Sequence, residues 1–174
     1  MNRRIYKPLS NFDLDDFYKE IKDKKANIQM YNDIKKNNNI HTLFKNNDYC
    51  IIFLDNPDKN ESIGHWIMIF FNKQSQNDVF FFDSYGYDIN YLAPKLKDIL
   101  FQKFERIHCN KIKYQQLGDN SATCGRWCIL NVGLNNLMRN YDFAILKNVI
   151  DFLKSKDKLK TYNQVVSKYI DIEL

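Results

Sequence analysis

The sequence predicts a single α+β domain with a small mixed or antiparallel central sheet flanked by helices. Two observations lead to this class. Short apolar runs bounded by polar turns occupy the middle of the 174-residue chain, and longer segments with helical periodicity follow them. Neither an internal repeat nor a change of composition divides the chain, and its length suits one domain, residues 1–174, with a substantial core.

The first expected elements are a helix, a loop and a strand. Ser10 and Asn11 are typical N-cap residues, and the apolar residues behind them predict a helix over residues 12–23. These apolar residues at helical spacing are Leu14, Phe17, Tyr18 and Ile21. The lysine- and asparagine-rich run at 35–39 is interpreted as a surface loop. Residues 49–54 are apolar and are followed by Asp-Asn-Pro at 55–57, which predicts a strand followed by a turn.

A β-hairpin is expected next in the chain. Residues 65–71 and 79–82 are apolar runs joined by the polar stretch 72–78, so they should pair as antiparallel strands. The Tyr-Gly-Tyr sequence at 85–87 should then turn the chain out of the sheet.

The second half of the chain is predicted to be mostly helical. Residues 91–105 place apolar side chains on one side of a helix, whereas residues 111–116 are strand-like. A strongly apolar helix should begin at Cys124 and reach about residue 138. Two further helices, 142–155 and 159–171, have apolar faces with lysines opposite, the usual pattern of a helix with one solvated side.

Composition excludes several classes of protein. Hydrophobic residues make up 44% and aromatic residues 15%, so the chain is not mainly disordered. No stretch is apolar over the roughly 20 residues of a membrane span, and the N-terminal residues lack the apolar core of a secretory signal. The four cysteines are therefore expected to be thiols in a reducing compartment, and no His or Cys cluster completes a metal site around them.

Two titratable residues should meet at the open end of the hairpin. His65 begins one strand and Asp83 follows the other, so the two are expected to lie opposite or nearly opposite each other. A hydrogen bond between them would fix the tautomer of the imidazole and raise its basicity. A contact of this kind is more often structural than catalytic, so it needs a third group to indicate chemistry.

Cys124 supplies that third group. It lies between a polar loop and an apolar helix, and the N–H groups of a helix N-terminus favour a thiolate and can bind an oxyanion. Gly125 follows directly and allows a substrate to approach the backbone. Gln115 or Gln116, upstream of this loop, could donate a hydrogen bond to the same oxyanion. Cys50 and Cys128 are interpreted as buried core residues.

Four short blocks of sequence occur in a characteristic order. They are Gly64-His65-Trp66, Phe81-Phe82-Asp83-Ser84-Tyr85-Gly86, Gln115-Gln116 and Asn120-Ser121-Ala122-Thr123-Cys124-Gly125. Together they resemble the adenovirus proteinase (adenain) family of cysteine peptidases, which is grouped with the ubiquitin-like-protein proteases of eukaryotes. The order His, acid, Gln, Cys is that of this group, whereas papain-type enzymes place the Cys first. The resemblance covers about residues 50–135, and the sequence around Cys124 is similar to that of family members from large DNA viruses and virophages.

The resemblance implies a papain-like layout with a circularly permuted catalytic order, and a catalytic core over about residues 49–138. It implies His65 as general base, Asp83 as its orienting residue and Cys124 as nucleophile. The family's oxyanion glutamine falls on Gln115 or Gln116. The spacing to Cys124 is slightly longer than the usual pattern and leaves that choice open, although Gln116 is nearer the expected spacing. Trp66 is similar to an aromatic residue that narrows the substrate channel in this group and explains its preference for glycine near the cleaved bond. A place in the core is the alternative for Trp66.

The implied function is maturation of virions by cleavage of viral capsid and other structural proteins at Gly-containing sites. Such an enzyme is expected to act as a monomer in the virion and in the virus factory of the host cytoplasm. The alternatives are a deconjugating protease for a ubiquitin-like modifier, an acetyltransferase on the same framework, and an inactive binding module. Cleavage of a capsid protein by the wild type but not by a Cys124→Ala variant would exclude the inactive module. Efficient labelling of Cys124 by a ubiquitin-like modifier with a C-terminal electrophile would favour the deconjugating protease.

Adenovirus enzymes are stimulated by DNA and by a short peptide that attaches through a disulfide. The net charge of +5 allows DNA as an activating partner here. Cys109 is the residue to which an activating peptide could attach, although a thiol without a partner is the simpler interpretation. The lysines at 154, 156, 158 and 160 could face DNA, or they could mark a solvated helix junction. No cofactor is required by the sequence.

Overall fold

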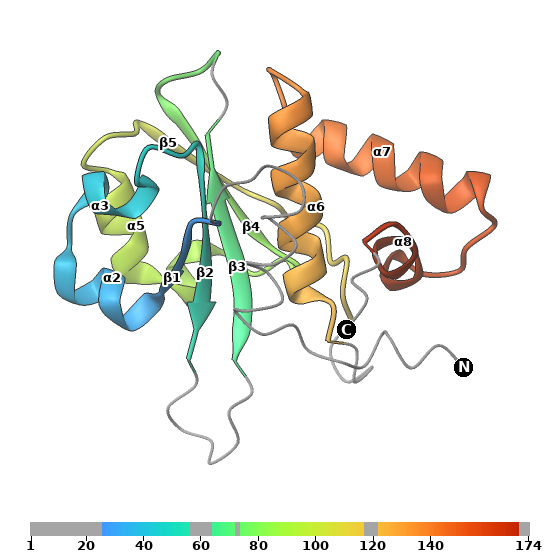
Figure 1. Ribbon diagram of the computed structural model, residues 1–174, viewed down its shortest axis with the longest axis horizontal. Helices are drawn as coiled ribbons and strands as arrows, with labels where there is room; N and C mark the ends of the chain where they lie inside the picture. Colours follow the sequence, from blue (N-terminus) through green and yellow to red (C-terminus); the bar gives the residue numbers. More distant parts are fainter. Residues whose placement is uncertain (1–25, 56–63, 72–73, 117–121, 171–174) are drawn as a thin grey trace.

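The computed structural model describes residues 26–55, 64–71, 74–116 and 122–170. Within them a five-stranded mixed sheet has the strand order β1-β2-β3-β4-β5 (Figure 1). Its strands are β1 (Ile28–Met30), β2 (Tyr49–Leu54), β3 (His65–Phe70), β4 (Asp78–Asp83) and β5 (Arg106–Cys109). The central strand β3 is antiparallel to both of its neighbours, β2 and β4, and each outer strand is parallel to its neighbour.

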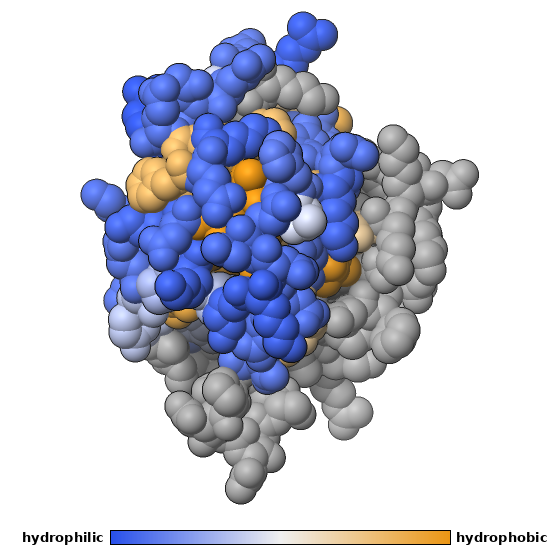
Figure 2. Space-filling model, turned by 90° about the vertical axis from the view of Figure 1, so that its left-hand side faces the viewer, coloured by the Kyte–Doolittle hydropathy of each residue, from blue (hydrophilic) through white to orange (hydrophobic). Residues whose placement is uncertain are grey.

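Helices cover both faces of this sheet, so the fold has three layers (Figure 1). One face carries α2 (Tyr31–Asn37), α3 (Ile40–Phe44), α4 (Ile89–Leu92) and α5 (Pro94–Leu100). The other carries α6 (Cys124–Leu137), α7 (Phe143–Lys156) and α8 (Tyr162–Tyr169). Seen from the side of α2, α3 and α5, the surface is mostly hydrophilic, with a small hydrophobic area near its middle (Figure 2). None of the helices in the described ranges is long and apolar enough to cross a bilayer.

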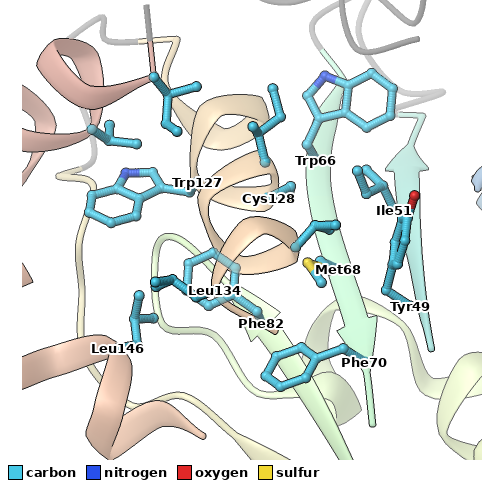
Figure 3. Packing of buried hydrophobic residues seen from close by; sticks show 14 of the residues in the cluster. Tyr49, Ile51, Trp66, Met68, Phe70, Phe82, Trp127, Cys128, Leu134 and Leu146 are labelled. Carbon is cyan, nitrogen blue, oxygen red and sulfur yellow. The ribbon is translucent and has the colours of Figure 1, made fainter. Parts of the chain in front are cut away.

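Each central strand contributes side chains to two separate cores. Trp66, Met68 and Phe70 of β3 belong to the core beneath α6, where Cys128 lies on the side of the helix nearest β3 and Trp127 on the side away from it (Figure 3). The alternate residues of β3 pack under α3, α4 and α5 on the opposite face. Because β4 is buried along its whole length, its sequence is a continuous apolar run rather than an alternating one.

The α+β class and the main elements predicted from the sequence are confirmed. The expected strands over 49–54, 65–71 and 79–82 correspond to β2, β3 and β4, and the last two form the expected antiparallel hairpin. The three expected C-terminal helices correspond to α6, α7 and α8. The helix expected over 12–23 lies outside the described residues, as do residues 56–57 of the first expected turn.

The single helix expected over 91–105 is wrong, because this region forms two short helices, α4 and α5. The break lies at Ala93, whose backbone is not helical, and Pro94 begins α5. A proline disfavours the helical conformation of the residue before it and suits the first position of a new helix. Helix α5 then ends at Leu100, and turns carry the chain to β5.

Two further expectations are corrected. Residues 111–116 are not a strand, since the N–H groups of Tyr114 and Gln115 both donate to the carbonyl of Ser84; the strand lies earlier, at β5. The run at 35–39 is not all loop, because residues 35–37 form the last turn of α2, and Asn38 caps this helix in the left-handed conformation.

Candidate active site

The open end of the β3–β4 hairpin brings His65 and Asp83 together. In the strand register Asp83 lies opposite Ile67, so His65 is its diagonal neighbour on the same face of the sheet. The Nε2 atom of His65 is 2.5 Å from Oδ1 of Asp83. The Asp83 side chain is fully buried, whereas that of His65 is 20% exposed. The expected pairing of these residues is therefore present, with the imidazole accessible from one side.

Asp83 is held by groups other than His65. Its Oδ2 atom accepts a hydrogen bond from the backbone N–H of Tyr87, 2.8 Å away. The buried Asn110 pairs with the backbone of Asp83, accepting from its N–H and donating to its carbonyl, both at 2.8 Å. These contacts extend the pairing between β4 and the segment after β5 by one residue. They fix the carboxylate at the end of the strand.

Cys124 is the first residue of α6 and reaches the same point from the other face of the sheet. Its sulfur contacts the His65 side chain and the backbone N–H groups of Trp66 and Gly125. Because Nε2 of His65 bonds to Asp83, Nδ1 is the ring nitrogen left to bond with the sulfur. Thr123 does not cap α6 with its side chain, since its hydroxyl donates to Asn163 of α8 at 2.9 Å. The first turn of α6 therefore has no side-chain cap from Thr123, and the Gly125 N–H within it contacts the sulfur.

The electrostatics of this group favour a thiolate beside an imidazolium. Burial alone would lower the pKa of His65, but its hydrogen bonds with Asp83 and Cys124 outweigh that effect and raise the pKa to about 9. Burial would raise the pKa of Cys124, but the contacts with His65 and with the two backbone N–H groups lower it overall. A thiol with a depressed pKa next to a base is the arrangement of an activated nucleophile.

The two candidate oxyanion residues lie in different environments. Gln115 is 1% exposed, and its Oε1 accepts a hydrogen bond of 2.9 Å from the hydroxyl of Ser84, the neighbour of Asp83. Nε2 is the donor atom of this amide. Gln116 is exposed to solvent. Of the two, the buried Gln115 is therefore the one fixed by side-chain contacts near the histidine and the carboxylate.

Trp66 and Gly125 contribute backbone groups to the site. The indole of Trp66, expected to line a substrate channel, is 3% exposed and packs in the core with its ring centroid 4.7 Å from that of Phe53. Gly125 lies in the first turn of α6 and is buried. Gly64 precedes His65 in a crowded position, where a Cβ atom would lie 1.7 Å from Cζ of Phe53.

The remaining cysteines are free thiols in other parts of the fold. Cys50 and Cys128 are fully buried in the two cores, as expected, and burial raises the pKa of both. Cys109 ends β5, is partly buried, and contacts Asp88. Among the described residues there is no group of three His, Cys, Asp or Glu side chains that could hold a metal ion.

Sequence reasoning missed three contributors to this site. Asn110, Ser84 and the backbone N–H of Tyr87 hold the groups that were predicted. Ser84 belongs to the block that contains Asp83, which is the one signal that could have indicated it. Asn110 lies in a polar stretch with no distinguishing pattern.

Comparison with known proteins gives relatives of limited similarity. No protein-family model matches the chain. The chain is similar to uncharacterized protein V9 of the Sputnik virophage, with 28% identity over 172 aligned positions that cover 90% of this chain and 87% of the relative.

Among solved structures, the chain is similar to two crystal structures of the ASFV pS273R protease, one of them the selenomethionine form. Their TM-scores are 0.49 and 0.46, each at 14% identity over 83% of this chain. The chain spans 63% and 62% of the length of those two protease chains. It is also similar to the central domain of uncharacterized Lpg1148 protein from Legionella pneumophila, with a TM-score of 0.45, 16% identity, and 94% and 96% of the two chains covered.

Proposed function

We propose that this chain is a cysteine endopeptidase in which Cys124 is the nucleophile, His65 the general base and acid, and Asp83 the orienting carboxylate. The observation that carries the proposal is the continuous set of contacts from the Cys124 sulfur through the His65 side chain to the buried Asp83. Nucleophile, base and orienting group within hydrogen-bond reach of one another are the geometric signature of this chemistry.

The reaction follows from these contacts. The thiolate of Cys124 attacks the carbonyl carbon of the scissile peptide bond and forms a C–S bond, giving a tetrahedral oxyanion. His65 then donates its proton to the leaving amine, the C–N bond breaks, and a thioester remains. A water molecule that gives up a proton to His65 attacks this thioester, which releases the carboxylic acid and regenerates the thiol.

Two groups are proposed to hold the oxyanion. One is the side-chain amide of Gln115, whose orientation is fixed through Oε1 by Ser84. The other is the backbone N–H of Cys124 at the start of α6, where the helix dipole also favours negative charge. Gln116 is left out of this assignment because its side chain is exposed.

The proposed substrates are capsid and other structural precursor proteins of a virus, cleaved at Gly-containing sites during virion maturation. The similarity to a virophage protein along nearly the whole chain supports a viral origin. The sequence blocks around His65, Asp83 and Cys124 support the peptidase class. The corresponding locations are the virion and the virus factory of the infected cell.

The proposal is tested by incubating the purified protein with the major and minor capsid proteins of its own genome and identifying the products by mass spectrometry. We expect cleavage by the wild type and by a Cys109→Ala variant, which changes a thiol outside the site, and none by Cys124→Ala. Cleavage that persists in Cys124→Ala would show that the nucleophile is wrongly assigned. Efficient labelling of Cys124 by a ubiquitin-like modifier with a C-terminal electrophile, without capsid cleavage, would instead favour a deconjugating protease.

DNA and an activating peptide remain proposed partners. The net charge of +5 supports an attraction to the phosphates of DNA. Binding through such charges weakens steeply as the salt concentration rises. We therefore expect any stimulation of cleavage by DNA to disappear between low and moderate salt. Stimulation that is independent of salt would contradict an electrostatic contact.

A further inference from the structure

Three tyrosines form a continuous row of rings that starts at the imidazole of His65. The ring centroids of His65 and Tyr85 are 5.0 Å apart, those of Tyr85 and Tyr87 6.3 Å, and those of Tyr87 and Tyr91 5.2 Å. We call Tyr85, Tyr87 and Tyr91 the tyrosine strip. The strip leads from the proposed catalytic histidine along the turn after β4 to helix α4.

The far end of the strip is open to solvent. Tyr91 is 74% exposed, and Tyr85 and Tyr87 are partly exposed. Other large apolar side chains of the described residues are also exposed, among them Phe101 and Phe152, but Tyr91 is the one joined to His65 by consecutive ring contacts. Exposed tyrosines present a rigid apolar face with a polar tip, which makes them effective contact residues at low conformational cost.

The backbone beneath the strip is fixed. Gly86 adopts a φ of +74°, and a Cβ there would lie 3.2 Å from the backbone of Ile112, so the turn lies close against the chain after β5. The N–H of Tyr87 donates to Asp83, and the Asp88 side chain caps α4 by accepting from the N–H of Asn90 at 2.8 Å. A surface held in place before binding loses little entropy when a ligand docks on it.

We propose that the tyrosine strip binds an extended segment of the polypeptide substrate and selects an aliphatic or aromatic side chain at a distance from the cleaved bond. This inference rests on the proposed peptidase function. The three ring-to-ring steps from His65 correspond to roughly five residues of extended chain at about 3.3 Å per residue. The side chain that contacts Tyr91 therefore belongs to a residue up to about five positions from the scissile bond.

A polypeptide is favoured over a nucleic acid by the charge along the strip. Asp88 is exposed between Tyr87 and Tyr91, and its carboxylate would repel a phosphate backbone that followed the rings. Lys97, whose charge acts on Asp88, is bonded to the Asn90 side chain at 2.7 Å. An uncharged peptide backbone with an apolar side chain meets no such repulsion.

The test compares long and short fluorogenic peptides. Long peptides extend about six residues to either side of a Gly-X bond, with leucine, tryptophan, alanine or aspartate placed in turn at each position, and short ones end about two residues from the bond. We expect Tyr91→Ala to lower the ratio of long-peptide to short-peptide kcat/KM by about three- to tenfold for the leucine and tryptophan guests, through KM. Tyr91→Phe keeps the ring and should restore the ratio. Phe152→Ala, which removes an exposed ring of α7, should leave the ratio at the wild-type value. An unchanged ratio in Tyr91→Ala at all guest positions would overturn the proposal.

A binding measurement separates this inference from the peptidase proposal. In the Cys124→Ser background, fluorescence anisotropy gives the Kd of the long peptides without turnover, and adding Tyr91→Ala should raise that Kd by a similar factor. If the wild type cleaves no peptide, the proposed peptidase function fails, and the strip is judged by these Kd values alone. Equal Kd values for Cys124→Ser with and without the added Tyr91→Ala substitution would refute the binding role of the tyrosine strip. Binding of a single-stranded oligonucleotide that depends on Tyr91, with no such dependence for peptides, would also refute the assignment to polypeptide.

Discussion

Replacing Asp83 by asparagine tests whether this carboxylate sets the pKa of the catalytic histidine. The hydrogen bond from Asp83 is the largest of the influences that raise the pKa of His65, and it acts against the lowering effect of burial. A pKa of about 9 in place of 6.5 corresponds to about 3 kcal/mol in favour of the imidazolium. An asparagine has no charge to stabilise that cation, and its amide can hold the imidazole in the wrong tautomer. We expect kcat/KM to fall by about 10³-fold.

The pH profile gives the sharper result. His65 must be protonated to donate to the leaving amine, so activity should be lost as pH rises through the pKa of His65, about 9 in the wild type. With that pKa lowered in Asp83→Asn, the alkaline limb should move towards neutral pH. Asp78→Asn is the matched control, since Asp78 at the other end of β4 bonds to His108 at 2.9 Å, and its removal should leave the limb near pH 9. The reasoning is refuted if the residual activity of Asp83→Asn keeps the alkaline limb of the wild type.

Three other changes probe how the site is held. Gly64→Ala should lower kcat/KM by about tenfold or more, because the added Cβ would collide with the ring of Phe53 and displace the adjoining strand end. Phe53→Ala in the same chain should recover part of this loss. If the effects of the two substitutions are simply additive in the double-mutant cycle, the collision is contradicted. Asn110→Leu leaves the buried N–H of Asp83 without its partner, whereas the Asp83 carbonyl keeps the N–H of Gly86 at 2.9 Å. Urea titration should therefore show a loss of about 1–3 kcal/mol in unfolding free energy, and a loss below the error of the titration would mean that the N–H finds another partner. Iodoacetamide near neutral pH should modify Cys124 before Cys128. Local contacts lower the pKa of Cys124, whereas burial raises the pKa of Cys128. Equal rates of modification of the two cysteines in peptide mass mapping would argue against an activated thiol at Cys124.

The parts of the fold that could be predicted are those in which one physical signal dominates. β2, β3 and β4 are apolar runs that are buried on both faces over most of their length, and α6 is an apolar segment that follows a polar loop. The hairpin register then followed from the length of the polar connection. This register was accurate enough to place His65 near Asp83. The structure shows that the two hydrogen-bonded residues are diagonal neighbours rather than directly opposite each other.

The parts that could not be predicted depend on long-range contacts. β1 is three residues long, and its pairing with β2 is supported by Asn27, whose side chain donates to the backbone of Leu43, Phe44 and Tyr49. β5 is an edge strand whose exposed Arg106 and His108 bond to Asp78, so its sequence looks polar although it completes the sheet. Nothing local in either segment indicates a strand, because the stabilising partners lie far away in the sequence.

The site combines two packing units, and this explains why its geometry depends on the core. His65 and Asp83 belong to the sheet, whereas Cys124 belongs to α6. This helix packs on the sheet through Cys128, which lies on its β3 side, and through Trp127, whose ring centroid is 6.5 Å from that of Phe82 in β4. The distance between sulfur and imidazole is therefore set by how deeply α6 is seated on the sheet. Thr123 ties the start of α6 to Asn163 of α8, so the C-terminal helices also act on the position of the thiol. A close-packed interior resists such displacement, because moving the helix would open cavities along the whole β3–α6 interface. The two C-terminal helices, which contribute no reacting group, are in this way part of the machinery that keeps the nucleophile against its base.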